Sequence, residues 1–163
     1  MIVVVMGVAG SGKSHVAASL ASALSWAYVD ADDFHPEGNI TKMARGVPLD
    51  DADRKPWLDA IRASLRRFER SRDDVVLACS ALKRDFRRRL AAGFTSVHFV
   101  YLKGDLELFE RRISGREDHF FEVQLLASQF EALEAPEPEE AIVVDAAEPA
   151  AVIVATVRRA LRR

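Results

Sequence analysis

Gly7-Val8-Ala9-Gly10-Ser11-Gly12-Lys13-Ser14 is the stretch that decides how this chain folds. It follows the β-branched run Ile2 to Met6 and precedes apolar residues at helical spacing, so it should connect a buried strand to a helix. The pattern G-x-x-x-x-G-K-[ST] in this position is typical of a phosphate-binding loop, because glycines let backbone N–H groups turn toward an anion at a helix N-terminus. All eight residues are therefore predicted to bind ATP, with Lys13 reaching the β- and γ-phosphates and the Ser14 hydroxyl ligating Mg²⁺.

Buried strands and helical patterns alternate along the rest of the chain. Trp57, Leu58, Ile61, Leu65 and Phe68 form one apolar helical stripe, and Pro56 suits its first turn. Asp105 and Pro149 can begin two further helices. Besides residues 2–6, four runs read as strands: Ala27 to Asp30, Val75 to Cys79, Val97 to Leu102 and Ala141 to Asp145. The alternation predicts an α/β fold, a doubly wound parallel five-stranded sheet in a single domain covering residues 1–163.

Composition narrows the class of protein. The chain has 163 residues, of which 49% are hydrophobic, and its 23 basic and 25 acidic residues give a formal charge of −2. This balance argues against a broad nucleic-acid or membrane footprint. Cys79, the only cysteine, lies in an apolar run and is expected to be a buried, inert thiol. No apolar stretch approaches the length of a membrane span, so we expect a cytoplasmic protein.

Asp30-Ala31-Asp32 stands at the carboxyl end of the second predicted strand, the edge at which open parallel sheets bind ligands. Side chains alternate along an extended strand, so both carboxylates should face the same cleft. Asp30 is expected beside Ser14 as a metal ligand. Asp32 is expected to orient an acceptor hydroxyl and take its proton, as a catalytic residue. The alternative is a solvated strand end with a helix cap.

Several stretches beyond the phosphate loop resemble the gluconokinases. They cover nearly the whole chain in order: Asp30-Ala31-Asp32-Asp33-Phe34-His35-Pro36, Asn39-Ile40-Thr41-Lys42-Met43, Gly46-Val47-Pro48-Leu49, Asp51-Ala52-Asp53-Arg54-Lys55-Pro56-Trp57-Leu58, Cys79-Ser80-Ala81-Leu82-Lys83-Arg84, Tyr101-Leu102-Lys103-Gly104, His119-Phe120-Phe121 and Ser128-Gln129-Phe130. The departures are Ala9 in place of the usual Ser, Ala31 where Gly is common, and Asp118 where Gly often precedes the His. None of them removes a group that the chemistry needs.

The resemblance implies a fold like that of the nucleoside monophosphate kinases, with Mg²⁺-ATP as phosphoryl donor. It implies D-gluconate as acceptor, 6-phosphogluconate as product, and often a homodimer. The resemblance also implies roles for two polar segments that interrupt the alternation of strands and helices. Residues 33–55 become an acceptor-side insert, and residues 114–121 become a lid.

Gluconate is a carboxylate with a row of hydroxyls, so its site needs cations and polar donors. The insert supplies His35, Lys42, Arg54 and Lys55, and Arg84 follows the third strand. All five are predicted to bind the acceptor, with exposed side chains or structural ion pairs as the alternative. Arg112 and Arg116 flank the lid segment and are predicted to bind ATP by bringing cations to the transferred phosphoryl group. Their alternative is ordinary helix-end arginines.

The sequence argues against several other functions. A GTPase would need an Asn-Lys-x-Asp motif, but the only asparagine, Asn39, precedes Ile40. A mechanical ATPase would need a metal-binding aspartate after a strand, and Ile142-Val143-Val144-Asp145 mimics this only in the last strand. A non-catalytic nucleotide-binding module would not explain the paired aspartates. Another small acceptor, such as shikimate or a nucleoside monophosphate, is excluded by the resemblance alone and not by residue chemistry.

Overall fold

The predicted sheet is present in the structure, a computed structural model that describes residues 1–114 and 119–162, with the side chains of 119–124 excepted. Five parallel strands lie in the order β2-β3-β1-β4-β5, with β1 in the centre. Each strand falls within one residue of its predicted range. Their bounds are Ile2–Met6 for β1, Ala27–Asp30 for β2, Val75–Ala78 for β3, Val97–Lys103 for β4 and Ile142–Asp145 for β5.

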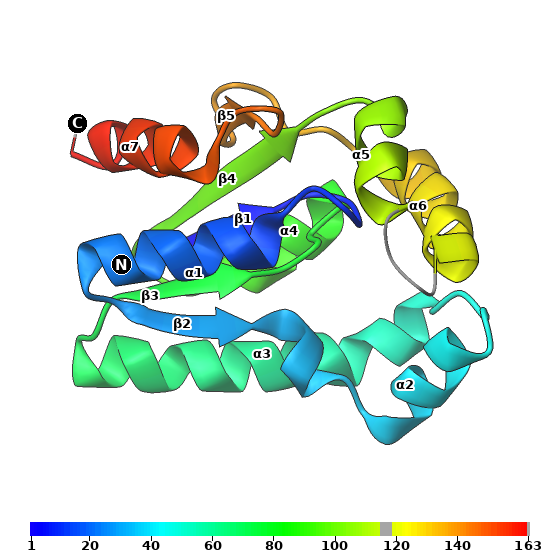
Figure 1. Cartoon of the computed structure of the whole chain (residues 1–163). Coiled ribbons are helices and arrows are strands. Elements are labelled where there is room, and N and C mark those ends of the chain that lie inside the picture. Colours follow the sequence, from blue (N-terminus) through cyan, green and yellow to red (C-terminus); the bar gives the residue numbers. More distant parts are fainter. Residues whose placement is uncertain (115–118, 163) are drawn as a thin grey trace.

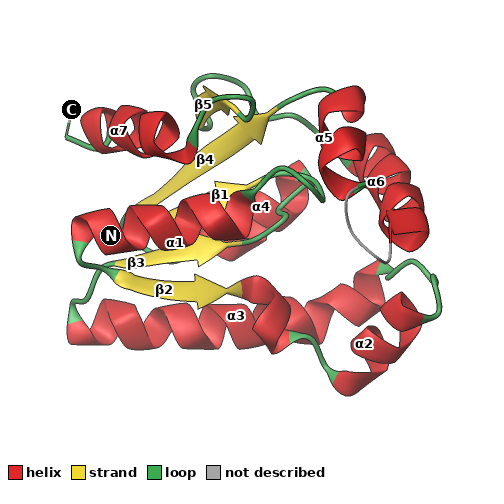
Figure 2. Cartoon of the chain, in the orientation of Figure 1, coloured by secondary structure: helices red, strands yellow, loops and turns green. Residues whose placement is uncertain are grey.

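Helices cover both faces of the sheet, as the doubly wound class requires (Figures 1 and 2). On one face, Val3 and Val5 of β1 pack in a core with α1 (Lys13–Leu24) and α7 (Ala150–Ala160). On the other face, Ile2, Val4 and Met6 pack in a second core with α3 (Asp51–Ser71) and α4 (Arg84–Ala91). Because β1 is buried on both sides, its sequence is a continuous apolar run instead of an alternating one.

The remaining helices gather beyond the carboxyl ends of the strands. They are α2 (Glu37–Ala44), which follows β2, and α5 (Leu106–Ile113) and α6 (His119–Ala132), which follow β4 and pack together. Figure 1 shows α2 and the α5–α6 pair at the same end of the sheet, on either side of the loop that joins β1 to α1. The phosphate loop therefore lies between α2, which belongs to the predicted insert, and the α5–α6 pair.

One helix begins earlier than its sequence predicts. Pro56 was expected in the first turn, but α3 begins at Asp51 and Pro56 lies inside it. Asp50 caps the helix: its side chain accepts a hydrogen bond from the Asp53 N–H at 2.7 Å, and the Asp53 carboxylate accepts one from the Asp50 N–H at 3.0 Å. This reciprocal capping box stabilises an additional turn ahead of the proline. Part of the predicted insert, residues 33–55, is consequently helical.

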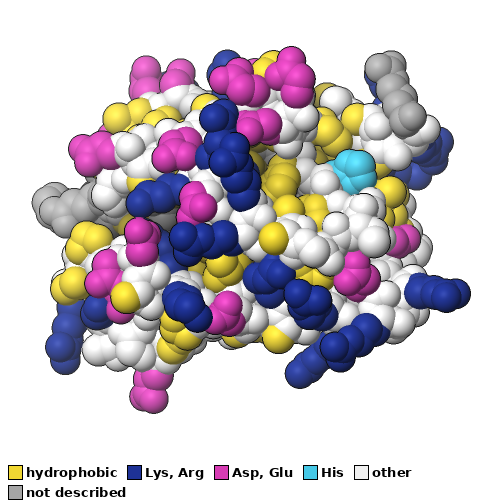
Figure 3. Space-filling view, turned by 180° about the vertical axis from the view of Figure 1, so that it is seen from behind, with side chains coloured by type: hydrophobic (Ala, Val, Ile, Leu, Met, Phe, Trp, Pro, Cys, Tyr) yellow, Lys and Arg dark blue, Asp and Glu magenta, His cyan; other side chains and the backbone are white. Residues whose placement is uncertain are grey.

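The surface mixes charges of both signs. On the face seen in Figure 3, lysines and arginines are interspersed with aspartates and glutamates, in keeping with the small net charge of the sequence. Among the described helices, we find none that is both long enough and apolar enough to cross a membrane.

Candidate active site

The phosphate loop has the backbone geometry that its glycines permit. Gly12 is the N-cap of α1 with φ 85°, and Gly10 has φ 75°, a left-handed conformation that other residues rarely adopt. A Cβ atom at Gly10 would also lie 3.0 Å from Ile113 of α5. Inside the loop, the Ser11 N–H donates to the Val8 carbonyl at 3.2 Å. The first amides of α1 have no acceptor within the helix, so they are available to an anion.

The carboxyl end of β2 brings Asp30 to Ser14. The Ser14 hydroxyl donates to Asp30 Oδ2 at 2.9 Å, and the Tyr28 hydroxyl donates to the same oxygen at 3.0 Å. Hydroxyl and carboxylate oxygens are the ligands that Mg²⁺ prefers in proteins, so this pair fits the predicted metal site. Among the described residues, no group of three or more histidine, cysteine, aspartate or glutamate side chains is placed to hold a metal.

The backbone after Asp30 differs from the extended strand end that the sequence predicted. Residues Ala31–Phe34 form a 3₁₀ turn, which Asp30 caps by accepting the Asp32 N–H at 3.0 Å. The aspartate side chain offers the backbone this local hydrogen bond in place of a further ladder bond, so the strand ends there. Ala31 is nevertheless buried and Asp32 points to solvent, with 76% of its side chain exposed.

Lys13 lies close to both carboxylates. Burial lowers the pKa of the Lys13 ammonium, and the charges of Asp32 and Asp30 oppose that shift. The three side chains therefore share one region at the carboxyl edge of the sheet. Burial also raises the pKa of the nearby Cys79 thiol to about 12, so it stays protonated, in agreement with an inert buried cysteine.

His35 is packed in the interior, so little of its side chain is accessible to an acceptor substrate. Its ring stacks on Trp57 with centroids 4.4 Å apart, and only 7% of its side chain is exposed. Its Nε2 lies 3.9 Å from Asp32 Oδ1, and its Nδ1 lies 3.4 Å from Asn39 Nδ2. Trp57 is itself buried and donates from Nε1 to the Ala31 carbonyl at 2.6 Å, so it is a packing residue.

The buried position of His35 has a measurable pH consequence. Burial lowers the pKa of His35, with Arg54 contributing in the same direction and Asp32 opposing it. Below the unfolded-state value of about 6.5, the unfolded chain binds a proton that the folded chain disfavours. The protein should therefore lose unfolding free energy on acidification through this range.

We expect His35→Phe, which keeps an aromatic ring against Trp57 but cannot titrate, to reduce that loss. Thermal melts at pH 7.5 and 5.5, compared between the two proteins, check it. His98→Phe is the control, because the His98 side chain is exposed and, among the described residues, hydrogen-bonds only to Ser96. Equal pH dependence in wild type and His35→Phe would contradict the assignment.

The three insert cations predicted to bind the acceptor all have acidic neighbours. Lys42 Nζ donates to both oxygens of Asp53 at 2.8 Å. Lys55 pairs with Asp59 at 3.1 Å and is largely exposed. Arg54 is held least, at 3.6 Å from the exposed Asp51, and its charge acts on His35. Of the three, Arg54 is thus best placed to meet an anion beside Asp32, although the acceptor-binding role of each stays a prediction.

The remaining predicted arginines lie in different surroundings. Arg84 forms an ion pair with Glu140 at 3.1 Å, which ties the start of α4 to the segment before β5. Arg112 of α5 donates to the Ser11 carbonyl of the phosphate loop at 3.4 Å and to the Ala146 carbonyl at 2.6 Å. Arg116 and half of the predicted lid (residues 115–118 of 114–121) lie outside the described residues. The acceptor-binding role of Arg84 and the ATP-binding roles of Arg112 and Arg116 stay predictions.

Two residues of this region were assigned no role from the sequence, although Gln129 lies in the quoted stretch Ser128-Gln129-Phe130. Tyr28 lies two positions before Asp30 on the same strand, and this spacing was the available signal, because residues i and i+2 share a face of the sheet. Gln129 of α6 accepts a hydrogen bond from the Ala9 N–H at 2.7 Å across 120 residues of sequence. No local pattern could have indicated that contact.

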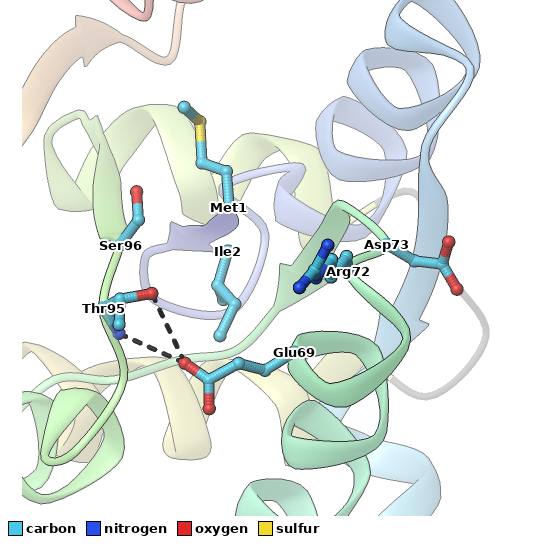
Figure 4. A pocket seen from close by; sticks show the side chains of 7 residues that line it. All are labelled: Met1, Ile2, Glu69, Arg72, Asp73, Thr95 and Ser96. Atoms are coloured by element: carbon cyan, nitrogen blue, oxygen red, sulfur yellow. Dashed lines mark hydrogen bonds between the residues drawn. The ribbon is translucent and has the colours of Figure 1, made fainter.

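A cavity of about 210 Å³ lies away from these residues. It is found where β1 begins and where the loop before β4 meets the end of α3 (Figure 4). There the Glu69 carboxylate accepts hydrogen bonds from Thr95. None of the predicted site residues lines it. Its lining residues are Met1, Ile2, Glu69, Arg72, Asp73, Thr95 and Ser96.

Known proteins resemble this chain over most of its length. A family model described as an AAA domain matches residues 2–136. The thermoresistant gluconokinase of Escherichia coli (strain K12) is 43% identical over 164 residues, covering 99% of this chain and 94% of that protein. A crystal structure of a gluconokinase from Sinorhizobium meliloti 1021 superposes with a TM-score of 0.88 at 42% identity, covering 99% of this chain and 91% of that one.

A more distant structure matches the fold alone. A shikimate kinase from Aquifex aeolicus vf5 superposes with a TM-score of 0.66 at 16% identity, covering 99% of this chain and 96% of that one. The parallel sheet, the phosphate loop and the full-length relatives agree with one another. The chain therefore belongs to the gluconokinase family of P-loop kinases.

Proposed function

We propose that this protein transfers the γ-phosphoryl group of ATP to the 6-hydroxyl of D-gluconate, releasing ADP and 6-phospho-D-gluconate. The observation that carries the proposal is the match to a gluconokinase at 43% identity over 99% of the chain. The site supports it, because Lys13, Asp30 and Asp32 converge beside a phosphate loop. Phosphoryl transfer needs positioning and charge stabilisation more than covalent chemistry, and these groups supply both.

Each residue has a defined part in this proposal. The amides of the phosphate loop and the Lys13 ammonium bind the β- and γ-phosphates, and the ammonium offsets charge on the transferred group. Asp32, whose carboxylate is exposed, orients the acceptor hydroxyl and accepts its proton. Arg54, beside His35 and only loosely paired with Asp51, binds the gluconate carboxylate.

Ser14 and Asp30 would hold Mg²⁺. Their oxygens lie 2.9 Å apart, and both are hard donors of the kind that this ion selects. When bound, Mg²⁺ neutralises charge on the phosphates. Tyr28 donates to the same Asp30 oxygen as Ser14 does, which holds that oxygen in place.

The acceptor is tested by comparing acids with neutral analogues. D-gluconate should stimulate ADP release strongly, whereas D-glucitol, an open-chain polyol of the same length without the carboxylate, should not. Loss of a hydrogen-bonded charge typically costs about 10- to 100-fold, so kcat/KM should differ by at least that factor. A coupled assay of ADP release measures it, with glucose, shikimate and AMP as further acceptors.

Arg54→Ala should raise the KM for gluconate and reduce the difference between gluconate and glucitol. Arg67→Ala, an exposed arginine farther along α3, is the control. Comparable kcat/KM for gluconate and glucitol would remove the carboxylate from recognition. A preference for shikimate or AMP would show that gluconate is not the acceptor.

A cytoplasmic location and a homodimer complete the proposal, on the basis of the family resemblance. Sedimentation of the purified protein gives the oligomeric state directly, with a mass near twice the 18.1 kDa of the chain expected for the dimer.

A further inference from the structure

Gln129 of α6 contacts the phosphate loop at its backbone. Its Oε1 accepts a hydrogen bond from the Ala9 N–H at 2.7 Å, in a part-buried position. Strand β1 holds one end of the loop and helix α1 holds the other. A bond between the middle of the loop and α6 therefore fixes a point that β1 and α1 leave free.

The surroundings of this contact are packed. Phe130, the next residue of α6, packs against Phe109 of α5, with ring centroids 6.0 Å apart. Phe109 is fully buried, and its carbonyl would lie 3.1 Å from a Cβ atom at Gly10. Arg112 of α5 adds a hydrogen bond to the Ser11 carbonyl. The outer side of the loop thus lies directly on the α5–α6 pair seen in Figure 1.

Because of this contact, the amides of the loop donate to different partners. Ala9 donates outward to Gln129, and Ser11 donates to Val8 within the loop. Gly12, Lys13 and Ser14 open α1, and their amides face no helical acceptor, so they remain for the phosphates. An anion site of this kind binds more tightly when its donors are already in place, because less conformational entropy is lost on binding.

We propose that Gln129 is a positioning residue for the nucleotide: it holds the Ala9 amide and thereby keeps the phosphate loop in its binding shape. The proposal rests on the proposed use of ATP at this loop and not on the identity of the acceptor. Glutamine suits the role because its oxygen accepts the hydrogen bond without adding a negative charge. A carboxylate at this place would accept the same bond but would repel the phosphates.

Gln129→Ala removes the acceptor. In the ligand-free protein, the Ala9 amide should exchange with solvent faster and its NMR resonance should move. The Kd for a non-hydrolysable ATP analogue, measured by calorimetry with Mg²⁺ and without gluconate, should rise by about five- to tenfold, the scale of one neutral hydrogen bond. Ser128→Ala is the matched control, because Ser128 is exposed on the same helix and donates to Leu125 within it.

Gln129→Glu separates the hydrogen bond from the charge. The Ala9 amide should stay protected as in the wild type, while the Kd for the analogue rises and the rise becomes smaller with added salt. Unchanged Ala9 exchange and unchanged Kd in a folded Gln129→Ala protein would overturn the proposal. If that variant does not fold, loss of Ala9 protection in Gln129→Glu would overturn it instead. Neither measurement depends on gluconate, so failure here is distinct from failure of the proposed acceptor.

Discussion

Lys13→Ala is expected to abolish turnover and to leave the fold intact. The ammonium acts on charge that develops on the transferred phosphoryl group, so its loss should lower kcat by about 10³-fold or more. Stability should not fall with it. Burial lowers the pKa of Lys13, which means that the folded protein disfavours this charge relative to the unfolded chain. Removing the charge should therefore remove an unfavourable contribution to the free energy of folding.

The measurements are the steady-state rate of ADP release and a thermal melt without ligand. Lys13→Met keeps most of the length of the side chain and should show the same loss of kcat, which separates charge from packing. A folded Lys13 variant with near-normal activity would remove the phosphate-loop lysine from the mechanism.

Asp32→Asn should lower kcat by about 10²-fold or more, with the affinity for ATP nearly unchanged. The substitution keeps the size of the side chain but removes the group that accepts the hydroxyl proton. Asp33→Asn is the matched control, because Asp33 is an exposed carboxylate on the same 3₁₀ turn. It should leave kcat within a few-fold of the wild type.

Asp30→Asn should behave differently from Asp32→Asn. Its oxygen lies against the Ser14 hydroxyl, so the variant should raise the Mg²⁺ concentration needed for half-maximal rate. Titration of Mg²⁺ at saturating ATP and gluconate measures it for both variants. An exchange of the two effects would reverse the assignment. If neither variant changed kcat by more than a few-fold, both aspartates would be caps of the strand end.

The strands and the phosphate loop could be predicted from short stretches of sequence. Ile2 to Met6 and Val75 to Ala78 are buried on both faces, so their continuous apolar runs stand out against the amphipathic helices. The phosphate loop consists of consecutive residues, and its glycines, lysine and serine act through local backbone geometry. The contact between Ser14 and Asp30 also followed, because all parallel strands of a sheet have their carboxyl ends at the same edge, although β3 lies between β1 and β2.

At two places, local hydrogen bonds produced a backbone structure that differs from the one that the sequence pattern predicted. Asp30 captured the Asp32 N–H and turned the predicted strand end into a 3₁₀ turn. Asp50 and Asp53 capped α3 ahead of Pro56. The residues that favour these structures were visible in the sequence. Their energies are small and similar to those of the alternatives, so spacing alone could not rank them.

By itself, the sequence determined the fold class, the phosphate loop and the edge of the sheet at which the chemistry lies, since each depends on residues close together in the chain. Only the tertiary structure decided that His35 is stacked on Trp57 and mostly buried, that Arg84 pairs with Glu140, and that Gln129 holds the Ala9 amide. These contacts join elements far apart in sequence, and they depend on how whole helices pack against the sheet, which no local spacing records.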